Sequence, residues 1–122
     1  MDILAFREYV LSLPNVEETT PFDDVTLVYK VGGRMFSCAD MEEFTRVVIH
    51  HDADRGVELR DRYESITPAF HFNKTYWSSI DSESDIPFAT VCELLRESYL
   101  YTIRRNVTPK ALRERLLREA EE

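Results

Sequence analysis

The sequence predicts an α+β domain: an antiparallel sheet of about five to six strands with helices packed on one side, plus a C-terminal helix. Two alternating apolar runs flank Gly32-Gly33, a helical apolar stripe runs through residues 87–105, and residues 70–77 contain the only tryptophan. A chain of 122 residues has the size of one domain. Residues 1–122 are therefore assigned to a single domain, with residues 106–122 as a C-terminal helical extension.

The chain begins with a predicted helix. Asp2 precedes apolar residues at helical spacing and is the expected N-cap of a helix that runs to Leu13. Pro14 ends this helix because proline lacks the backbone N–H that the next turn needs. Residues 15–20 are predicted to be a polar connector.

A β-hairpin is predicted next, with strands over residues 25–31 and 34–39. Two glycines separate the strands, and glycine adopts the positive φ of a two-residue turn at no steric cost. Arg34 is expected at the hairpin end, with its head group in solvent. The side chains expected to pair across the hairpin and to share the core face are Tyr29 with Phe36 and Leu27 with Cys38.

A third strand and a short helix are predicted to follow. Residues 44–51 contain a continuous apolar run, which is typical of a central strand with both faces partly covered. Asp52 is the expected N-cap of a short helix that ends near Tyr63.

The stretch that contains the tryptophan is predicted to be a second hairpin. Its strands are expected over residues 69–72 and 76–80, joined by a three-residue turn, and its register is left open. Strand alternation places Phe70 and Phe72 on the core face and His71 on the opposite face.

Two helices are predicted to complete the chain. Pro87 opens the longest helix, which ends near Arg105. Thr108 is the expected cap of a last helix that Pro109 opens. The stripe of the longest helix is expected to form the centre of the core: Phe88, Val91, Cys92, Leu95, Tyr99 and Ile103.

The charge of the chain is negative but uneven. A net charge of −8 weakens the case for nucleic-acid binding, because nonspecific affinity comes largely from neutralised phosphates. Residues 104–118 nevertheless contain six Lys and Arg residues and a single acidic residue, Glu114. This segment is either a basic contact patch or a solvated helix face with ordinary i,i+4 pairs.

The composition indicates a cytoplasmic protein without membrane attachment. No apolar run approaches the ~20 residues needed to cross a bilayer, and the start, Met1-Asp2-Ile3, lacks the basic residues of a signal peptide. In a reducing compartment, Cys38 and Cys92 are expected to be buried free thiols. A disulfide or a reactive thiol is the alternative.

No motif indicates catalysis, a metal or a cofactor. Three glycines cannot build a nucleotide-binding loop, and no Gly-x-Ser-x-Gly motif is present. His50 and His51 are neighbours in a strand and point to opposite faces, so they cannot hold one ion together. His71 has no carboxylate at an evident spacing for acid–base chemistry. A protein that is not an enzyme, with no metal and no cofactor, is expected.

Several short motifs occur in a fixed order: Val16-Glu17-Glu18, Pro21-Phe22, Gly32-Gly33-Arg34-Met35-Phe36, His71-x-Asn73-Lys74-x-x-Trp77 and Ser98-Tyr99. Together they resemble the MmcQ/YjbR family over most of the chain, from Leu11 to about Arg105. The resemblance implies a fold similar to frataxin and CyaY, and DNA binding through two hairpin wings. Asp23 stands where the family usually has glycine, which makes phosphate contact at the first wing less favourable. The acidic ridge that binds iron in frataxin is not matched, so iron binding is not transferred.

Two functional hypotheses follow. In the first, the chain binds DNA weakly and in a salt-sensitive way through the two hairpins and the last helix. In the second, it is a non-catalytic module that binds a protein partner or a small anion in a pocket formed by Arg34, His71, Asn73 and Trp77. The site candidates are Arg34, His71, Asn73, Lys74 and Trp77 from the resemblance, and Arg105, Arg113 and Arg115 from the basic segment.

Overall fold

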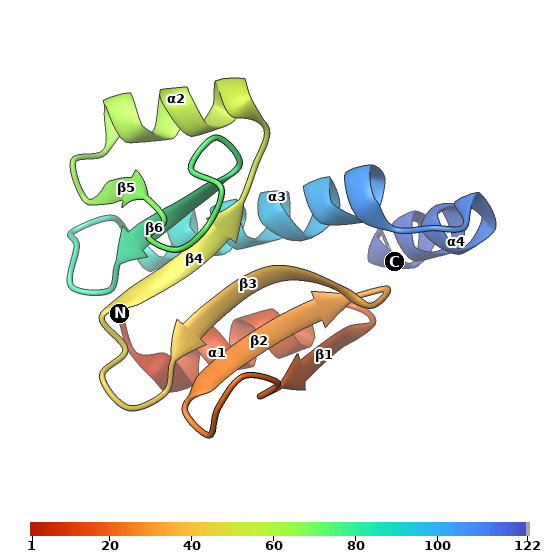
Figure 1. The fold of residues 1–122 in the computed structure, drawn as a ribbon, viewed down its shortest axis with the longest axis horizontal. Coiled ribbons are helices and arrows are strands. Elements are labelled where there is room, and N and C mark those ends of the chain that lie inside the picture. The colour runs from red at the N-terminus through yellow and green to blue at the C-terminus, as the bar shows by residue number, and fades with distance from the viewer. Residues whose placement is uncertain (122) are drawn as a thin grey trace.

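The computed structural model describes residues 1–121. Four helices and six strands follow one another along the chain (Figure 1). Within the described residues, no helix is both long enough and apolar enough to span a membrane. The elements are α1 (Ile3–Ser12), β1 (Val16–Thr19), β2 (Thr26–Val31), β3 (Arg34–Asp40), β4 (Arg46–His50), α2 (Ala53–Arg62), β5 (Ile66–Pro68), β6 (Trp77–Asp81), α3 (Phe88–Asn106) and α4 (Lys110–Ala120).

The predicted fold class is confirmed. The six strands form one antiparallel sheet in the order β1-β2-β3-β4-β6-β5. Figure 1 shows α1 and α3 behind the sheet, α2 beside the β5 edge, and α4 turning back next to the end of α3. The core lies between the sheet and the helices, with Phe6, Phe36 and Tyr99 fully buried.

The prediction of a polar connector over residues 15–20 is wrong, because residues 16–19 form the edge strand β1. Asn15 has a φ of 65°, which turns the chain back so that Val16 pairs with Val31. The carboxylate of Glu18 accepts hydrogen bonds from Arg7 at 2.6 and 2.7 Å and from the Tyr29 hydroxyl at 2.8 Å. A polar sequence suits an edge strand whose side chains find partners outside the core.

The first hairpin is confirmed, but its predicted register is wrong. Leu27 pairs with Ala39, Val28 pairs with Cys38, and the register shifts between Tyr29 and Lys30. The shift is a bulge, which inserts one residue and reverses the faces beyond it. Phe36 therefore stays in the core, with its ring centroid 5.5 Å from that of Tyr99, whereas Cys38 lies on the other face of the sheet.

The second hairpin exists, but its first strand lies earlier than predicted. Ile66 pairs with Ile80 in β5–β6, and residues 69–76 form a loop. The Phe72 N–H donates to the Ala69 carbonyl (3.3 Å), which closes a turn and takes Phe70 and His71 out of the extended conformation. His71 has a φ of 72°, and Phe70 is 65% exposed instead of lying in the core.

The helix boundaries follow their caps, with two corrections. The side chains of Asp2 and Asp52 accept from backbone N–H groups as predicted, at 3.2 and 2.7 Å. Thr108 does not cap α4, because the helix begins at Lys110 and Pro109 occupies the capping position. On α3 the buried face is Val91, Leu94, Leu95, Ser98, Tyr99, Thr102 and Ile103, so Phe88 is exposed and Cys92 only half-buried. Both cysteines are free thiols.

The strands β3 and β4 separate at one end (Figure 1). Their last pair in register is Ser37 with Ile49. At the next position the hydroxyl of Ser98, on α3, accepts from the His50 N–H (2.7 Å) and donates to the Phe36 carbonyl (2.6 Å). A helix side chain thus replaces one backbone contact of the ladder. We call this the open end of the sheet; the β2–β3 turn, His50, Trp77 and the last two turns of α3 all lie there.

Candidate functional site

The structure brings most of the predicted site residues to the open end, but in two groups. Arg34 belongs to the first hairpin, whereas Trp77 begins β6, with β4 between them in the sheet. Neighbouring strands lie about 4.8 Å apart, so the two groups are separated by roughly 10 Å or more. Of the basic candidates, Arg105 lies on the last turn of α3, and Arg113 and Arg115 lie on α4.

The loop over residues 69–76 is organised by Asn73. Its side-chain oxygen accepts from the Thr75 N–H (3.0 Å), and its carbonyl accepts from the N–H groups of Tyr76 and Trp77 at 3.1 and 3.0 Å. Asn73 therefore holds the turn rather than presenting its side chain to a ligand. His71 and Lys74 are exposed and lie around the ring of Phe70, with the Lys74 Nζ 5.8 Å from its centroid.

Trp77 stacks on a buried histidine. Its ring centroid lies 4.1 Å from that of His50, with an angle of 14° between the planes, and Tyr101 packs edge-on against the same imidazole. The His50 Nδ1 lies 2.8 Å from the Thr102 hydroxyl. Burial, helped by the neighbouring His51, lowers the pKa of His50 to about 4. His50 is therefore neutral near pH 7.

His51 is fixed by a separate set of contacts. Its Nδ1 lies 2.8 Å from the Asp52 carbonyl and must donate to it, so its Nε2 accepts from the Ser78 hydroxyl at 2.7 Å. That hydroxyl in turn accepts from Arg60 (2.9 Å). Burial lowers the pKa of His51 as well. No group of three or more His, Cys, Asp or Glu side chains within residues 1–121 could hold a metal ion.

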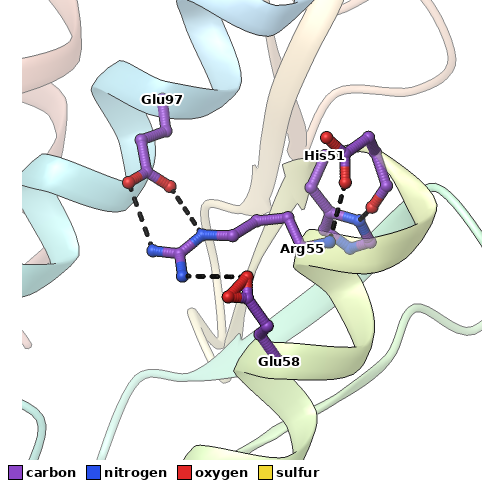
Figure 2. A network of polar contacts seen from close by, with 5 residues as sticks. His51, Arg55, Glu58 and Glu97 are labelled. Atoms are coloured by element: carbon purple, nitrogen blue, oxygen red, sulfur yellow. Dashed lines mark hydrogen bonds and ion pairs between the residues drawn. The ribbon is translucent and has the colours of Figure 1, made fainter.

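A cavity of about 350 Å³ opens beside His50, between the start of α2 and the second half of α3. Figure 2 shows its charged wall, where Arg55 lies between Glu97 and Glu58. The Arg55 guanidinium donates two hydrogen bonds to Glu97, at 3.1 and 3.2 Å, and lies 3.8 Å from Glu58. The lining residues are His50, His51, Asp52, Asp54, Arg55, Glu58, Glu97, Tyr101 and Arg104.

A second hollow of about 390 Å³ continues from the first. The two share Asp52, Asp54 and Tyr101, and the second adds Tyr76 and Arg105. Together they form a groove from the charged wall at Arg55 to the base of the loop over residues 69–76. Of the predicted site residues, only Arg105 lines this groove.

Apart from Arg105, sequence reasoning misses the residues that line the groove. It considers His50 only as a metal ligand with His51 and rejects that role, and it assigns Phe70 to the core. One signal is present: Glu97, Tyr101 and Arg104 recur at i, i+4 and i+7, off the apolar stripe of α3. Such spacing places them on one helix face, which points to a polar-aromatic surface.

The two ends of the sheet differ in the charge of their loops. The loops at the far end of the sheet, residues 20–25, 41–45 and 82–87, contain acidic residues and neither Lys nor Arg. At the open end, four cations come from three segments, and within residues 1–121 none of them forms an ion pair. These open-end cations are Arg34, Lys74, Arg104 and Arg105, all of them exposed.

The chain is similar to known proteins over most of its length. A YjbR family model matches residues 11–101. The chain is 28% identical over 94 residues to the uncharacterised protein YbdF of Escherichia coli O157:H7, covering 76% of this chain and 77% of that one. It is 23% identical over 118 residues to the uncharacterised protein YjbR of Escherichia coli K12, covering 96% and 98%.

Two solved structures share the fold. The crystal structure of the Deinococcus radiodurans protein DR2400, of the DUF419 domain family, superposes with a TM-score of 0.84 at 38% identity, covering 93% of this chain and 86% of that one. A Pseudomonas syringae protein superposes with a TM-score of 0.70 at 14% identity, covering 84% and 99%, which indicates the fold alone. The match over residues 11–101 spans most of the sequence. It includes both hairpins and the groove-lining residues as far as Tyr101. The chain therefore belongs to the YjbR family.

Proposed function

We propose that this YjbR-family chain is a non-catalytic nucleic-acid-binding domain that contacts its ligand at the open end of the sheet. The observation that carries the proposal is the set of open-end cations: Arg34, Lys74, Arg104 and Arg105. They come from separate segments, and within residues 1–121 the fold places them at one end without carboxylate partners. Exposed, unpaired Lys and Arg side chains are what phosphate contacts require.

Part of the acidic charge behind the net charge of −8 lies away from the open end. The acidic loops lie at the far end, and screening at physiological salt limits their reach to about 8 Å. A phosphate backbone that contacts Arg34 and Lys74 is therefore screened from these distant loops. The carboxylates that lie closer line the groove beside α2, and two of them, Glu58 and Glu97, lie beside Arg55. Binding through few phosphates predicts a weak and salt-sensitive complex.

The loop over residues 69–76 adds an aromatic contact. Phe70 is 65% exposed beside Lys74, whose Nζ lies 5.8 Å from the ring centroid. An exposed ring beside a cation matches the stacking and phosphate contacts of proteins that bind single strands. The loop is therefore a better candidate for a contact surface than the first hairpin, whose tip packs against Val107.

The alternative, a module for a small anion or a protein partner, has weaker support. It requires Arg34, His71, Asn73 and Trp77 to line one pocket. Arg34 lies across β4 from Trp77, Asn73 is engaged in its own turn, and Trp77 stacks on His50.

The test is fluorescence anisotropy with labelled single-stranded and duplex DNA and single-stranded RNA at several salt concentrations. We expect binding that weakens with salt, and a salt slope that falls by about one for each of Lys74→Ala and Arg105→Ala. Arg46→Ala is the matched control, because Arg46 is exposed at the far end of the sheet. Absence of binding to all three ligands at tens of micromolar protein and low salt contradicts the proposal.

A further inference from the structure

We propose that the cavity beside His50 binds one unpaired nucleobase, and that it favours bases with an exocyclic amino group over thymine and uracil. This inference rests on the proposed function, because the cavity adjoins the open-end cations. The base could belong to a nucleic-acid strand or to a free nucleotide, and the experiment below separates these two sources.

The first observation is an unused hydrogen-bonding atom on a buried side chain. His50 is 8% exposed, its Nδ1 contacts Thr102, and its Nε2 has no hydrogen-bond partner among residues 1–121. In that part of the chain, only the Oδ1 of Asn106 is a fully buried side-chain atom without a partner, so the Nε2 is not sealed from solvent. His50 lines the cavity, and we infer that its Nε2 is the atom that meets a ligand there. A neutral imidazole nitrogen held in this way is positioned for a ligand.

The second observation is the aromatic wall. Trp77 stacks on the His50 ring and Tyr101 packs edge-on against it, with centroids at 4.1 and 4.7 Å, and these contacts fix the orientation of the imidazole. Tyr101 lines both halves of the groove. A planar base inserted there would stack on the Tyr101 ring. Because that ring is already packed against His50, little side-chain entropy is lost on binding.

The third observation decides the kind of base. Asp54 is exposed at the rim, lines both hollows, and has no ion-pair or hydrogen-bond partner within residues 1–121. Glu58 lies on the same wall and contacts Arg55 only at 3.8 Å. Carboxylates accept hydrogen bonds from exocyclic amino groups such as the N4 of cytosine. Thymine presents a carbonyl oxygen at that position, and two acceptors repel each other.

Cations flank the same groove where a strand would leave it. Arg104 lines the first hollow and Arg105 lines the second, and neither forms an ion pair within residues 1–121. A free carboxylate and two guanidinium groups along one groove match the two parts of a nucleotide. The base edge meets Asp54, while the phosphates on either side meet the arginines.

The test measures binding of the octanucleotides (dC)8 and (dT)8, and of the mononucleotides dCMP and TMP. Affinities for the octanucleotides are measured by fluorescence anisotropy of labelled strands. Occupation of the cavity by any of the four ligands is followed by the fluorescence of Trp77, the only tryptophan in the chain. A base bound at His50 alters this signal because Trp77 stacks on that ring. We expect (dC)8 to bind at least about 5-fold more tightly than (dT)8, a change of about 1 kcal/mol. Asp54→Asn should reduce this preference below about 2-fold without changing the salt slope.

Asp61→Asn is the matched control, because Asp61 is an exposed aspartate near the other end of α2. Both substitutions are on the surface, so loss of folding is not expected. Equal affinity for (dC)8 and (dT)8 with an unchanged tryptophan signal overturns the nucleobase site and leaves the proposed function standing. Binding of dCMP over TMP without binding of either octanucleotide keeps the site and overturns the proposed function. Failure of all four ligands to bind overturns both.

Discussion

The two hairpins reach the same end of the sheet but are held there by different chemistry. The turn of β2–β3 is apolar and closely packed: a Cβ added at Gly32 would lie 2.9 Å from both γ carbons of Val107 and 3.0 Å from a δ carbon of Leu116. The loop between β5 and β6 is held by hydrogen bonds to Asn73 and leaves Phe70 exposed. The first hairpin therefore anchors the C-terminal helix, and the second is free to contact a ligand.

Two of the motifs that resemble the family lie in these hairpins: Gly32-Gly33-Arg34-Met35-Phe36 and His71-x-Asn73-Lys74-x-x-Trp77. Only the first has a packing role strong enough to explain its residues. The glycines of the first motif are required by positive φ values of 58° and 79° and, at Gly32, by close contact. In the second motif, Asn73 has a turn role, whereas His71 and Lys74 lie exposed. The exposed residues are the ones for which a binding role remains to be tested.

The largest expected effect is at the packed hairpin. Gly32→Ala should lower the free energy of unfolding by about 3 kcal/mol, because it combines a left-handed backbone with overlap against Val107. Gly33→Ala should cost only about 1 kcal/mol, since the Cβ that it adds would meet nothing within 4 Å. Urea denaturation measures both. Equal losses in the two variants contradict the view that this tip is an anchor.

The stability that depends on His50, beside the second hairpin, should fall in acid. The pKa of His50 in the folded chain is about 4, below its usual value of 6.5, so the unfolded chain takes up a proton first as pH falls. Stability is then lost between about pH 6.5 and pH 4, by up to about 3 kcal/mol at about 1.4 kcal/mol per pKa unit.

Denaturant midpoints at several pH values, compared with those of His50→Phe, isolate this contribution from that of the carboxyl groups. His50→Phe should be less stable at pH 7, because Thr102 loses its partner, but should show a shallower decline with acid. An identical decline in both proteins means that His50 does not carry the effect.

A smaller loss is expected where α3 joins the separated strands. Ser98→Ala should cost about 2 kcal/mol, because the His50 N–H and the Phe36 carbonyl both lose their partner in a buried position. Ser12→Ala, at the exposed end of α1, is the control and should change stability by less than about 0.5 kcal/mol. A Ser98→Ala chain as stable as the wild type indicates that the strands re-pair directly.

The smallest effect on stability is expected at the exposed loop. Phe70→Ser should change the free energy of unfolding by less than about 0.5 kcal/mol, since the ring is 65% exposed. The same variant should weaken binding to single-stranded DNA by about 5-fold or more, as expected for a lost stacking contact. A large loss of stability with unchanged affinity would give the second hairpin the structural role that we assign to the first.

How far the sequence predicts the molecule depends on the range of the interactions. The caps at Asp2 and Asp52 and the turn at Gly32-Gly33 are local, and they are predicted correctly. The bulge at Tyr29 and the edge strand at Val16 depend on partners distant in the chain, and they are not. Periodicity assigns Phe70 to the core because it does not detect the turn that Phe72 closes.

The candidate site is less predictable than the fold for the same reason. The groove joins His50, Asp54 and Tyr101, which come from a strand end, a helix start and a distant helix. None of these residues has a sequence neighbour that marks its role. The predicted cations are in the sequence, but their lack of ion pairs within residues 1–121 is a property of the folded chain alone.

The hydroxyl of Ser98 has a consequence for hydrogen exchange. The amide proton of His50 is held by a helix side chain and not by a neighbouring strand. It can therefore exchange with deuterium when α3 moves away from the sheet, even while the strand pairs from Ser37 to Ala39 remain closed. The exchange rate of this one amide would report how often the helix and the sheet part, and a ligand that bridges β4 and α3 would slow it.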